Sequence, residues 1–166
     1  MVWNPRYARD LVLRGDRFAV EGRLQEAGGL YVESIEIIGS AQIHEIELDP
    51  EHSVGIPLSR ALGHERTGLV RVWTHDITSA RQEFDEAEAA LEASLAIVHR
   101  IPPEQAAIVE HVRVEAPLRW REMVRQEAQS YDSPPSVDIT MGMKLCRHGW
   151  LSKTGFCRGH PPDPCL

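Results

Sequence analysis

Apolar residues recur at intervals of three and four along much of this 166-residue chain, and this spacing limits its fold more than any other feature. The pattern is clearest after Thr78, where acidic residues occupy the positions between the apolar ones. The apolar stripe there consists of Phe84, Ala87, Leu91, Leu95 and Val98. Such spacing places apolar side chains on one face of an α-helix. We therefore predict a mainly α-helical fold.

The N-terminal segment carries the same spacing twice, with a break between. Asn4 and Pro5 favour a helix start, because Asn caps free amide groups and Pro loses no hydrogen bond at the first helical position. A second apolar face runs from Leu24 to Ile38, after a break at Glu21-Gly22-Arg23. The segment is therefore predicted to form a helical hairpin that ends near Gly39-Ser40.

Residues 13–40 resemble one tetratricopeptide repeat without a gap. The matching positions are Gly15, Phe18, Gly22, Arg23, Glu26, Ala27, Tyr31, Ser34 and Ile37. Residues 83–97 resemble the second helix of such a repeat. A single repeat cannot bury its apolar face alone, so the resemblance implies neighbouring helices in a repeat-like scaffold. It also implies a role in binding another protein.

The resemblance assigns packing roles to individual residues of the hairpin. Gly15 and Ala27 would let the two helices approach closely. Phe18 and Tyr31 would fill the space between them, and Gly22 would lie in the turn.

An α+β fold with an N-terminal β-hairpin region is the alternative. Phe18, Val20 and Leu24 can alternate with polar neighbours, and the Gly-Gly pair at 28–29 could form a turn. Residues 17–48 could thus be helical or strand. We favour helices, because short alternation arises by chance more easily than a gapless repeat match.

The middle of the chain is predicted to be broken into short elements. Pro50 and Pro57 mark turns, and a helix that opens at Pro57 is expected to stop at Gly63. The run 68–73 has strand-like composition, but a buried helix fits it equally well.

Prolines also divide the following part of the chain. Pro103 can begin a helix after Pro102 has ended the preceding one, and Pro117 is expected to end it before a further helix at 118–130.

We predict three regions: a helical scaffold domain at 1–129, a Pro/Ser linker at 130–137 and a zinc-binding tail at 138–166.

All three cysteines lie in this tail, beside two histidines. The candidate metal ligands are Cys146, His148, Cys157, His160 and Cys165. Two closely spaced Cys-His pairs joined by a short loop suit a tetrahedral zinc site, and thiolate with imidazole favours zinc over calcium or magnesium. Four protein ligands leave no position for water, which makes a structural zinc the expected cofactor. Either His160 or Cys165 could be the fourth ligand. A tail without metal and a disulfide are the other readings.

The pattern Cys-x-His-Gly followed by Cys-x-x-His resembles the zinc-knuckle and zinc-ribbon-like tails of small bacterial and phage proteins. The tail is also basic and aromatic, since Lys144, Arg147, Lys153 and Arg158 surround Trp150 and Phe156. Nucleic-acid association through the tail is therefore an alternative function. The net charge of −7 argues against duplex DNA as the main partner.

The expected function is that of a non-enzymatic adaptor that binds a protein partner. Neither a glycine-rich phosphate loop nor a nucleophile–base arrangement is apparent, so no catalytic residue is assigned. A metal-dependent phosphohydrolase that uses His75 and Asp76 is an unfavoured alternative. It would have to recruit further ligands from among His44, His52, His64, His99 and Asp85.

The N-terminus has no apolar core of a signal peptide, and no apolar run approaches the length of a membrane span. We therefore expect a cytoplasmic protein without a membrane partner, in which the cysteines are reduced. The partner's identity and the oligomeric state stay open.

Overall fold

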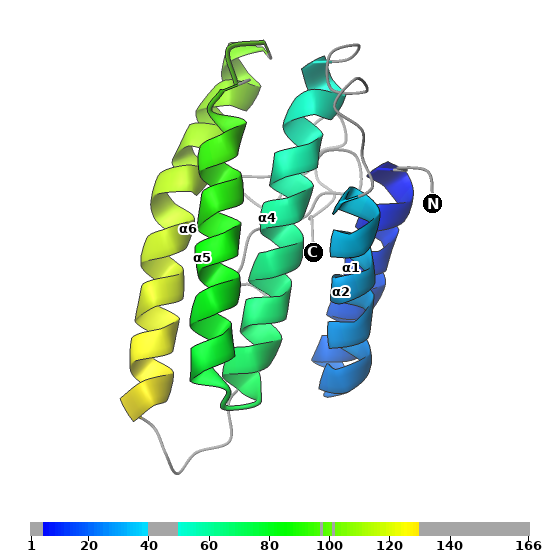
Figure 1. Ribbon diagram of the computed structural model, residues 1–166, viewed down its shortest axis with the longest axis vertical. Helices are drawn as coiled ribbons and strands as arrows, with labels where there is room; N and C mark the ends of the chain where they lie inside the picture. The colour runs from blue at the N-terminus through cyan, green and yellow to red at the C-terminus, as the bar shows by residue number, and fades with distance from the viewer. Residues whose placement is uncertain (1–4, 40–49, 97, 101, 130–166) are drawn as a thin grey trace, which may run out of the picture.

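The computed structural model describes residues 5–39, 50–96, 98–100 and 102–129, and this part of the chain is mainly α-helical (Figure 1). Its elements are α1 (Pro5–Val20), α2 (Leu24–Gly39), α4 (Pro50–Trp73), α5 (Ile77–Ser94), the 3-10 helix η1 (Val98–Arg100) and α6 (Pro103–Gln129). No strand occurs among these residues. The predicted linker and zinc tail lie outside them.

The predicted N-terminal hairpin is confirmed, with its turn at Gly22. The amide of Arg23 donates to the Phe18 carbonyl at 2.8 Å, and the amide of Gly22 donates to the Ala19 carbonyl at 3.0 Å. This pair of bonds closes the helix with a left-handed residue, and Gly22 has φ +80°. The β-hairpin alternative is wrong for residues 17–39, which are helical apart from this turn.

Gly15 allows α1 and α2 to approach closely. A Cβ at this position would overlap the ring of Tyr31, so only glycine leaves room for that ring. Tyr31 and Ala27 are fully buried, whereas Phe18 is half-buried and lies under the guanidinium of Arg23 at 3.9 Å. Gly15 is therefore a position of close approach and Tyr31 fills the space between the helices, as expected, whereas Phe18 is only partly buried.

The short elements expected between residues 50 and 73 are instead one helix, α4. It runs through Pro57 and Gly63 without a stop and includes 68–73, so the predicted turn at Pro57 and the strand reading are wrong. An internal proline costs a helix about 3 kcal/mol. Packing offsets this cost, since α4 contacts α1, α2, α5 and α6.

The glycines of α4 are sites of close packing rather than helix stops. A Cβ at Gly63 would lie 2.6 Å from Cγ1 of Ile35 in α2. A Cβ at Gly68 would lie 2.6 Å from Cε1 of Phe84 in α5. Each glycine thus admits a large side chain from a different neighbouring helix.

Two predicted helix ends near the C-terminal side also differ from the structure. The predicted end at Pro117 is wrong, because α6 continues through this residue from Pro103 to Gln129. The stripe that reaches Val98 predicts a longer α5, yet α5 ends at Ser94 and Val98 belongs to η1. Pro103 does begin α6, as expected.

The helices form a row in which each packs against the next along the chain (Figure 1). The main core runs through all of them, and a smaller apolar cluster lies between α1 and α2. Phe84 of α5 and Trp120 of α6 stack with ring centroids 5.4 Å apart. None of the helices in the described ranges has the length and apolar character to cross a membrane.

A candidate binding groove between α5 and α6

A network of buried polar side chains crosses the interior of the bundle. Asp16 of α1 accepts a hydrogen bond from the Tyr31 hydroxyl at 2.7 Å and another from Nε of Arg66 at 2.9 Å. All three residues are almost completely buried. Burial raises the pKa of Tyr31, and the adjacent Asp16 carboxylate raises it further.

The network continues from α4 to α6 through Glu65. Its Oε1 accepts from Arg66 at 2.5 Å, and its Oε2 accepts from Nε1 of Trp120 at 2.8 Å. Burial alone would lower the pKa of Arg66, but the neighbouring carboxylates of Asp16 and Glu65 more than offset this and raise it. The guanidinium is therefore charged, and hydrogen bonds satisfy the buried charges. The network holds Trp120 in one orientation.

Trp120 and its stacking partner Phe84 form the floor of a surface groove. Phe84 lies on Gly68 of α4, and Trp120 is tied to Glu65 of the same helix. Packing against α4 therefore fixes the Phe84 ring, and a hydrogen bond to α4 fixes the Trp120 ring. Side chains locked in this way are preorganised, so little conformational freedom is lost when something binds over them.

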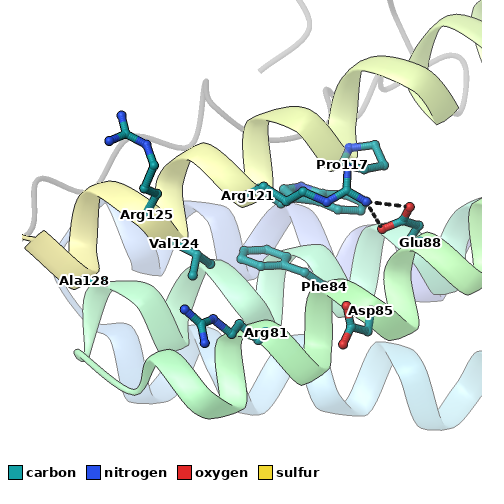
Figure 2. Close-up of a pocket in the computed structure, with 10 residues that line it drawn as sticks. Arg81, Phe84, Asp85, Glu88, Pro117, Arg121, Val124, Arg125 and Ala128 are labelled. Carbon is teal, nitrogen blue, oxygen red and sulfur yellow. Dashed lines mark hydrogen bonds and ion pairs between the residues drawn. The ribbon is translucent and has the colours of Figure 1, made fainter.

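The groove follows the seam of α5 and α6 and encloses about 490 Å³ (Figure 2). Its lining residues are Arg81, Phe84, Asp85 and Glu88 of α5, and Pro117, Trp120, Arg121, Val124, Arg125 and Ala128 of α6. At about 1.5 Å rise per residue, the lining spans roughly 10 Å of α5 and roughly 16 Å of α6. An elongated groove of this length has room for two or three side chains of an extended or helical segment.

Ion pairs close the α5–α6 seam at one end of the groove. Arg121 donates to both carboxylate oxygens of Glu88 at 2.9 Å (Figure 2), and Arg113 donates to Glu92 at 3.0 Å. Ion pairs between exposed side chains contribute about 0–1 kcal/mol each to the free energy of unfolding. Their main effect is on how α5 and α6 are aligned.

Arginines border the opposite end of the groove. Arg81 and Arg125 lie on facing helices near Val124 and Ala128 (Figure 2). Arg125 donates to Glu122 within its own helix at 2.6 and 2.8 Å. Hydrogen bonds from Arg125 and Gln126 lower the pKa of Glu122 to about 2. The Arg125 side chain points away from α5 (Figure 2), so Arg81, which is exposed, is the cation that borders this end on the α5 side.

The predicted zinc ligands cannot be placed, because Cys146, His148, Cys157, His160 and Cys165 lie outside the described residues. The zinc site thus stays a prediction. Within the described ranges, no three His, Cys, Asp or Glu side chains gather as a metal site would require.

His75 and Asp76 have structural roles at the turn between α4 and α5. The amide of Asp76 donates to the Arg71 carbonyl at 2.8 Å. His75 is the left-handed residue that closes α4, with φ 62°. Asp76 caps α5 by accepting from the Ser79 amide at 3.2 Å. Hydrogen bonds from Ser79 lower the pKa of Asp76. Nδ1 of His75 contacts the Glu127 carboxylate of α6.

The other residues considered for a metal hydrolase are dispersed. His64 contacts Glu83 at 2.8 Å, Asp85 lines the groove, and His99 lies in η1. His44 and the side chain of His52 lie outside the described residues. The described part of the chain does not bring these residues together around His75 and Asp76.

The groove and its buried support are structural features that the sequence analysis did not predict. The adjacent charges Glu65 and Arg66, in a helix with apolar residues one turn away on either side, could have indicated a buried network, since buried charges require partners. The sequence indicates the groove only weakly. The spacing of three and four from Arg81 to Glu88 places the α5 lining residues on one face of the helix. Nothing in the sequence aligns this face with residues 117–128.

Comparison of the chain with protein-family models, with curated proteins and with solved structures found no match in any of the three.

Proposed function

We propose that this protein is a non-enzymatic interaction module that binds a segment of a partner protein in the groove between α5 and α6. The observation that carries the proposal is the preorganised aromatic floor of Phe84 and Trp120 beneath a groove bordered by charged side chains. An apolar floor with a polar rim is the arrangement typical of protein interfaces. Helix-lined grooves commonly bind a segment through a few anchoring side chains.

The order of packing also supports a repeat-like interaction scaffold. The hairpin of α1 and α2 is followed by that of α4 and α5, and α6 packs on the second hairpin. Stacked helical hairpins form extended surfaces that repeat proteins use for binding. The tetratricopeptide-like match at residues 13–40 agrees with this proposal.

Selection of random twelve-residue peptides displayed on phage against the full-length protein tests the proposal. Ala128 is exposed and lines the groove, so Ala128→Trp should fill it and weaken the selected peptides at least tenfold. Ala107→Trp is the matched control, because it makes the same change at an exposed site of α6 that does not line the groove. Peptides that bind Ala128→Trp as well as the native protein, or no enrichment at all, would refute the proposal.

We also propose a structural zinc ion in the tail, on the strength of the Cys-His spacing. Elemental analysis of the purified protein should find about one zinc per chain. The double substitution Cys146→Ser and Cys157→Ser should remove it, because both ligand pairs lose their thiolate. Zinc below a tenth of an equivalent in the native protein, purified without chelator, would contradict the site.

The basic and aromatic tail supports the second candidate function, association with single-stranded nucleic acid. Binding of a fluorescent oligonucleotide should then weaken steeply as salt rises, because bound counterions are released from the phosphates. It should be lost when residues 138–166 are removed. Binding that ignores salt, or that survives the truncation, would exclude this role for the tail.

A further inference from the structure

Residues 137–145, which we call the alternating segment, carry an apolar side chain at every second position. The apolar residues are Val137, Ile139, Met141, Met143 and Leu145. The residues between them are Asp138, Thr140, Gly142 and Lys144. Strict alternation is typical of an extended segment in which one face is apolar and buried while the other is polar. The segment lies outside the described residues, so the pattern itself raises the question of what covers the apolar face.

The groove between α5 and α6 has one end close to the place where this part of the chain begins. Ala128 lines that end (Figure 2), and α6 stops one residue later, at Gln129. From Ala128 the lining runs back along α6 to Pro117. Residues 130–136 connect α6 to the alternating segment and can span at most about 25 Å. This connection is long enough for the chain to turn back and enter the groove from its Ala128 end.

The apolar surface along α6 has the length that the alternating segment requires. The α6 lining recurs at intervals of three and four, and the same spacing continued by one turn beyond Pro117 reaches Val114. Val114 is 49% exposed, so the apolar surface extends beyond the groove. From Val114 to Ala128 this face is about 21 Å long. Successive apolar side chains of an extended segment are about 6.6 Å apart, so about four of the five fit along it.

The charges of the groove and of the alternating segment are both balanced. Arg121 in the lining is paired with Glu88, and Arg81 and Asp85 have opposite signs one turn apart on α5. The alternating segment contains one Asp and one Lys, both at positions of its polar face. A segment that binds with its apolar face down therefore places no charge of its own on the floor of the groove, where burial of a charge would be unfavourable.

A second charge pattern draws this part of the chain toward the helices. Residues 139–162 contain four Lys or Arg and no Asp or Glu. Because the whole chain has a formal net charge of −7, the residues outside this run together carry −11. The basic run and the rest of the chain therefore attract each other, and this attraction acts over a longer distance than the apolar contacts.

We propose that the alternating segment binds in the α5–α6 groove of its own chain, with its apolar face over Phe84 and Trp120 and its polar face toward solvent. It thereby competes with any partner for the groove. A short connection gives such a segment an effective concentration on the order of millimolar, so even a modest affinity fills the groove. The inference requires the groove but not the partner proposed for it.

Photo-cross-linking in the full-length protein locates the segment. p-Benzoylphenylalanine in place of Met141 should form cross-links within the chain to peptides from 81–88 or 117–128, identified by mass spectrometry. The same group in place of Thr140, on the polar face, should give at most a fifth of that yield. Ala128→Trp should reduce the yield from position 141 at least fivefold, whereas Ala107→Trp should leave it unchanged.

Three outcomes of the cross-linking would overturn the proposal. The first is equal yields from positions 140 and 141, which would exclude an apolar face in the groove. The second is cross-links from position 141 to α1 or α2. The third is cross-linked dimers in place of cross-links within one chain, which would make a second copy the occupant.

A fluorescent peptide with the sequence of residues 136–145 measures the competition. It should bind full-length Met141→Asp at least fivefold more tightly than the native protein, because the altered segment competes less well for the groove. Thr140→Asp is the matched control, since it adds the same charge one position away on the polar face and should leave the peptide's affinity as in the native protein. Circular dichroism verifies that each variant is folded. Equal affinities for Met141→Asp and the native protein, or no binding to Met141→Asp, would refute the competition.

The two proposals for the groove fail in different ways. Phage-selected peptides that need Ala128, but bind Met141→Asp no more tightly than the native protein, refute the alternating segment as occupant and leave the groove as a partner site. Cross-links from position 141 to the groove lining, together with no enrichment of any displayed peptide, refute the partner and support the alternating segment.

Discussion

Arg66→Met is the substitution that most directly tests the buried network. Removing the guanidinium takes one charged partner from each of two buried carboxylates. Asp16 keeps the hydrogen bond from the Tyr31 hydroxyl, and Glu65 keeps the one from the Trp120 indole. Breaking a buried ion pair in this way costs about 3–5 kcal/mol, because an uncompensated charge stays inside the protein. The side chain of Arg66 is 1% exposed, so water screens little of this cost.

The loss is large compared with the stability of a domain of this size. Folded domains are stable by about 5–15 kcal/mol, so the variant should lose about a fifth or more of that margin. The melting temperature should fall by roughly 6–20 °C. Urea unfolding followed by far-ultraviolet circular dichroism at neutral pH measures the change in the free energy of unfolding.

Arg71→Met is the matched control on the same helix. Arg71 is about half exposed and lies 3.8 Å from the carboxylate of Asp76. Removal of such an exposed partner should cost no more than about 1 kcal/mol. If Arg66→Met does not fold, Arg66→Lys keeps the charge but loses the planar fork and should give an intermediate loss. A cost for Arg66→Met no greater than that for Arg71→Met would refute the view that this network holds the helices together.

Two further predictions concern Gly68 and Tyr31. Gly68→Ala should destabilise the protein by about 1–3 kcal/mol in urea unfolding and weaken groove ligands, because the new Cβ displaces the Phe84 ring. Gly29→Ala, exposed in α2 with open space around it, should instead stabilise by about 0.5–1 kcal/mol, and the same sign for both would contradict the packing argument. The pKa of Tyr31 is raised in the folded protein. Above about pH 10 the unfolded chain therefore releases a proton that the folded protein keeps, so stability falls as pH rises, by up to about 1.4 kcal/mol per pH unit. Tyr31→Phe should lack this part of the alkaline loss in urea titrations, and parallel curves for the two proteins would refute it.

The helical hairpin at the N-terminus could be predicted because its signals are local. The break at Gly22 and the apolar spacing on either side depend on neighbours within a few residues. The tetratricopeptide resemblance assigned close approach to Gly15 and a space-filling role to Tyr31, and the structure brings these two residues into contact. These features depend on backbone conformation and on residue spacing within one hairpin.

The prolines and glycines of α4 and α6 misled the prediction for a shared physical reason. Pro57 and Pro117 disfavour a continuous helix locally, and Gly63 by itself favours a helix end. Packing against several neighbours outweighs those local costs, and Gly63 allows Ile35 to approach. Whether a glycine ends a helix or receives a side chain depends on which element lies opposite, which spacing along one segment does not specify.

The amino-acid sequence by itself determined that the described chain is helical, where its first hairpin turns, and that its three cysteines lie in one tail beside two histidines. Those properties depend on apolar periodicity, turn chemistry and composition, all of which are local. Only the tertiary structure decided that Arg66 bridges Asp16 and Glu65, and that Phe84 and Trp120 stack beneath a groove between α5 and α6. Burial and charge pairing act between residues up to 55 positions apart, and folding alone brings these residues together.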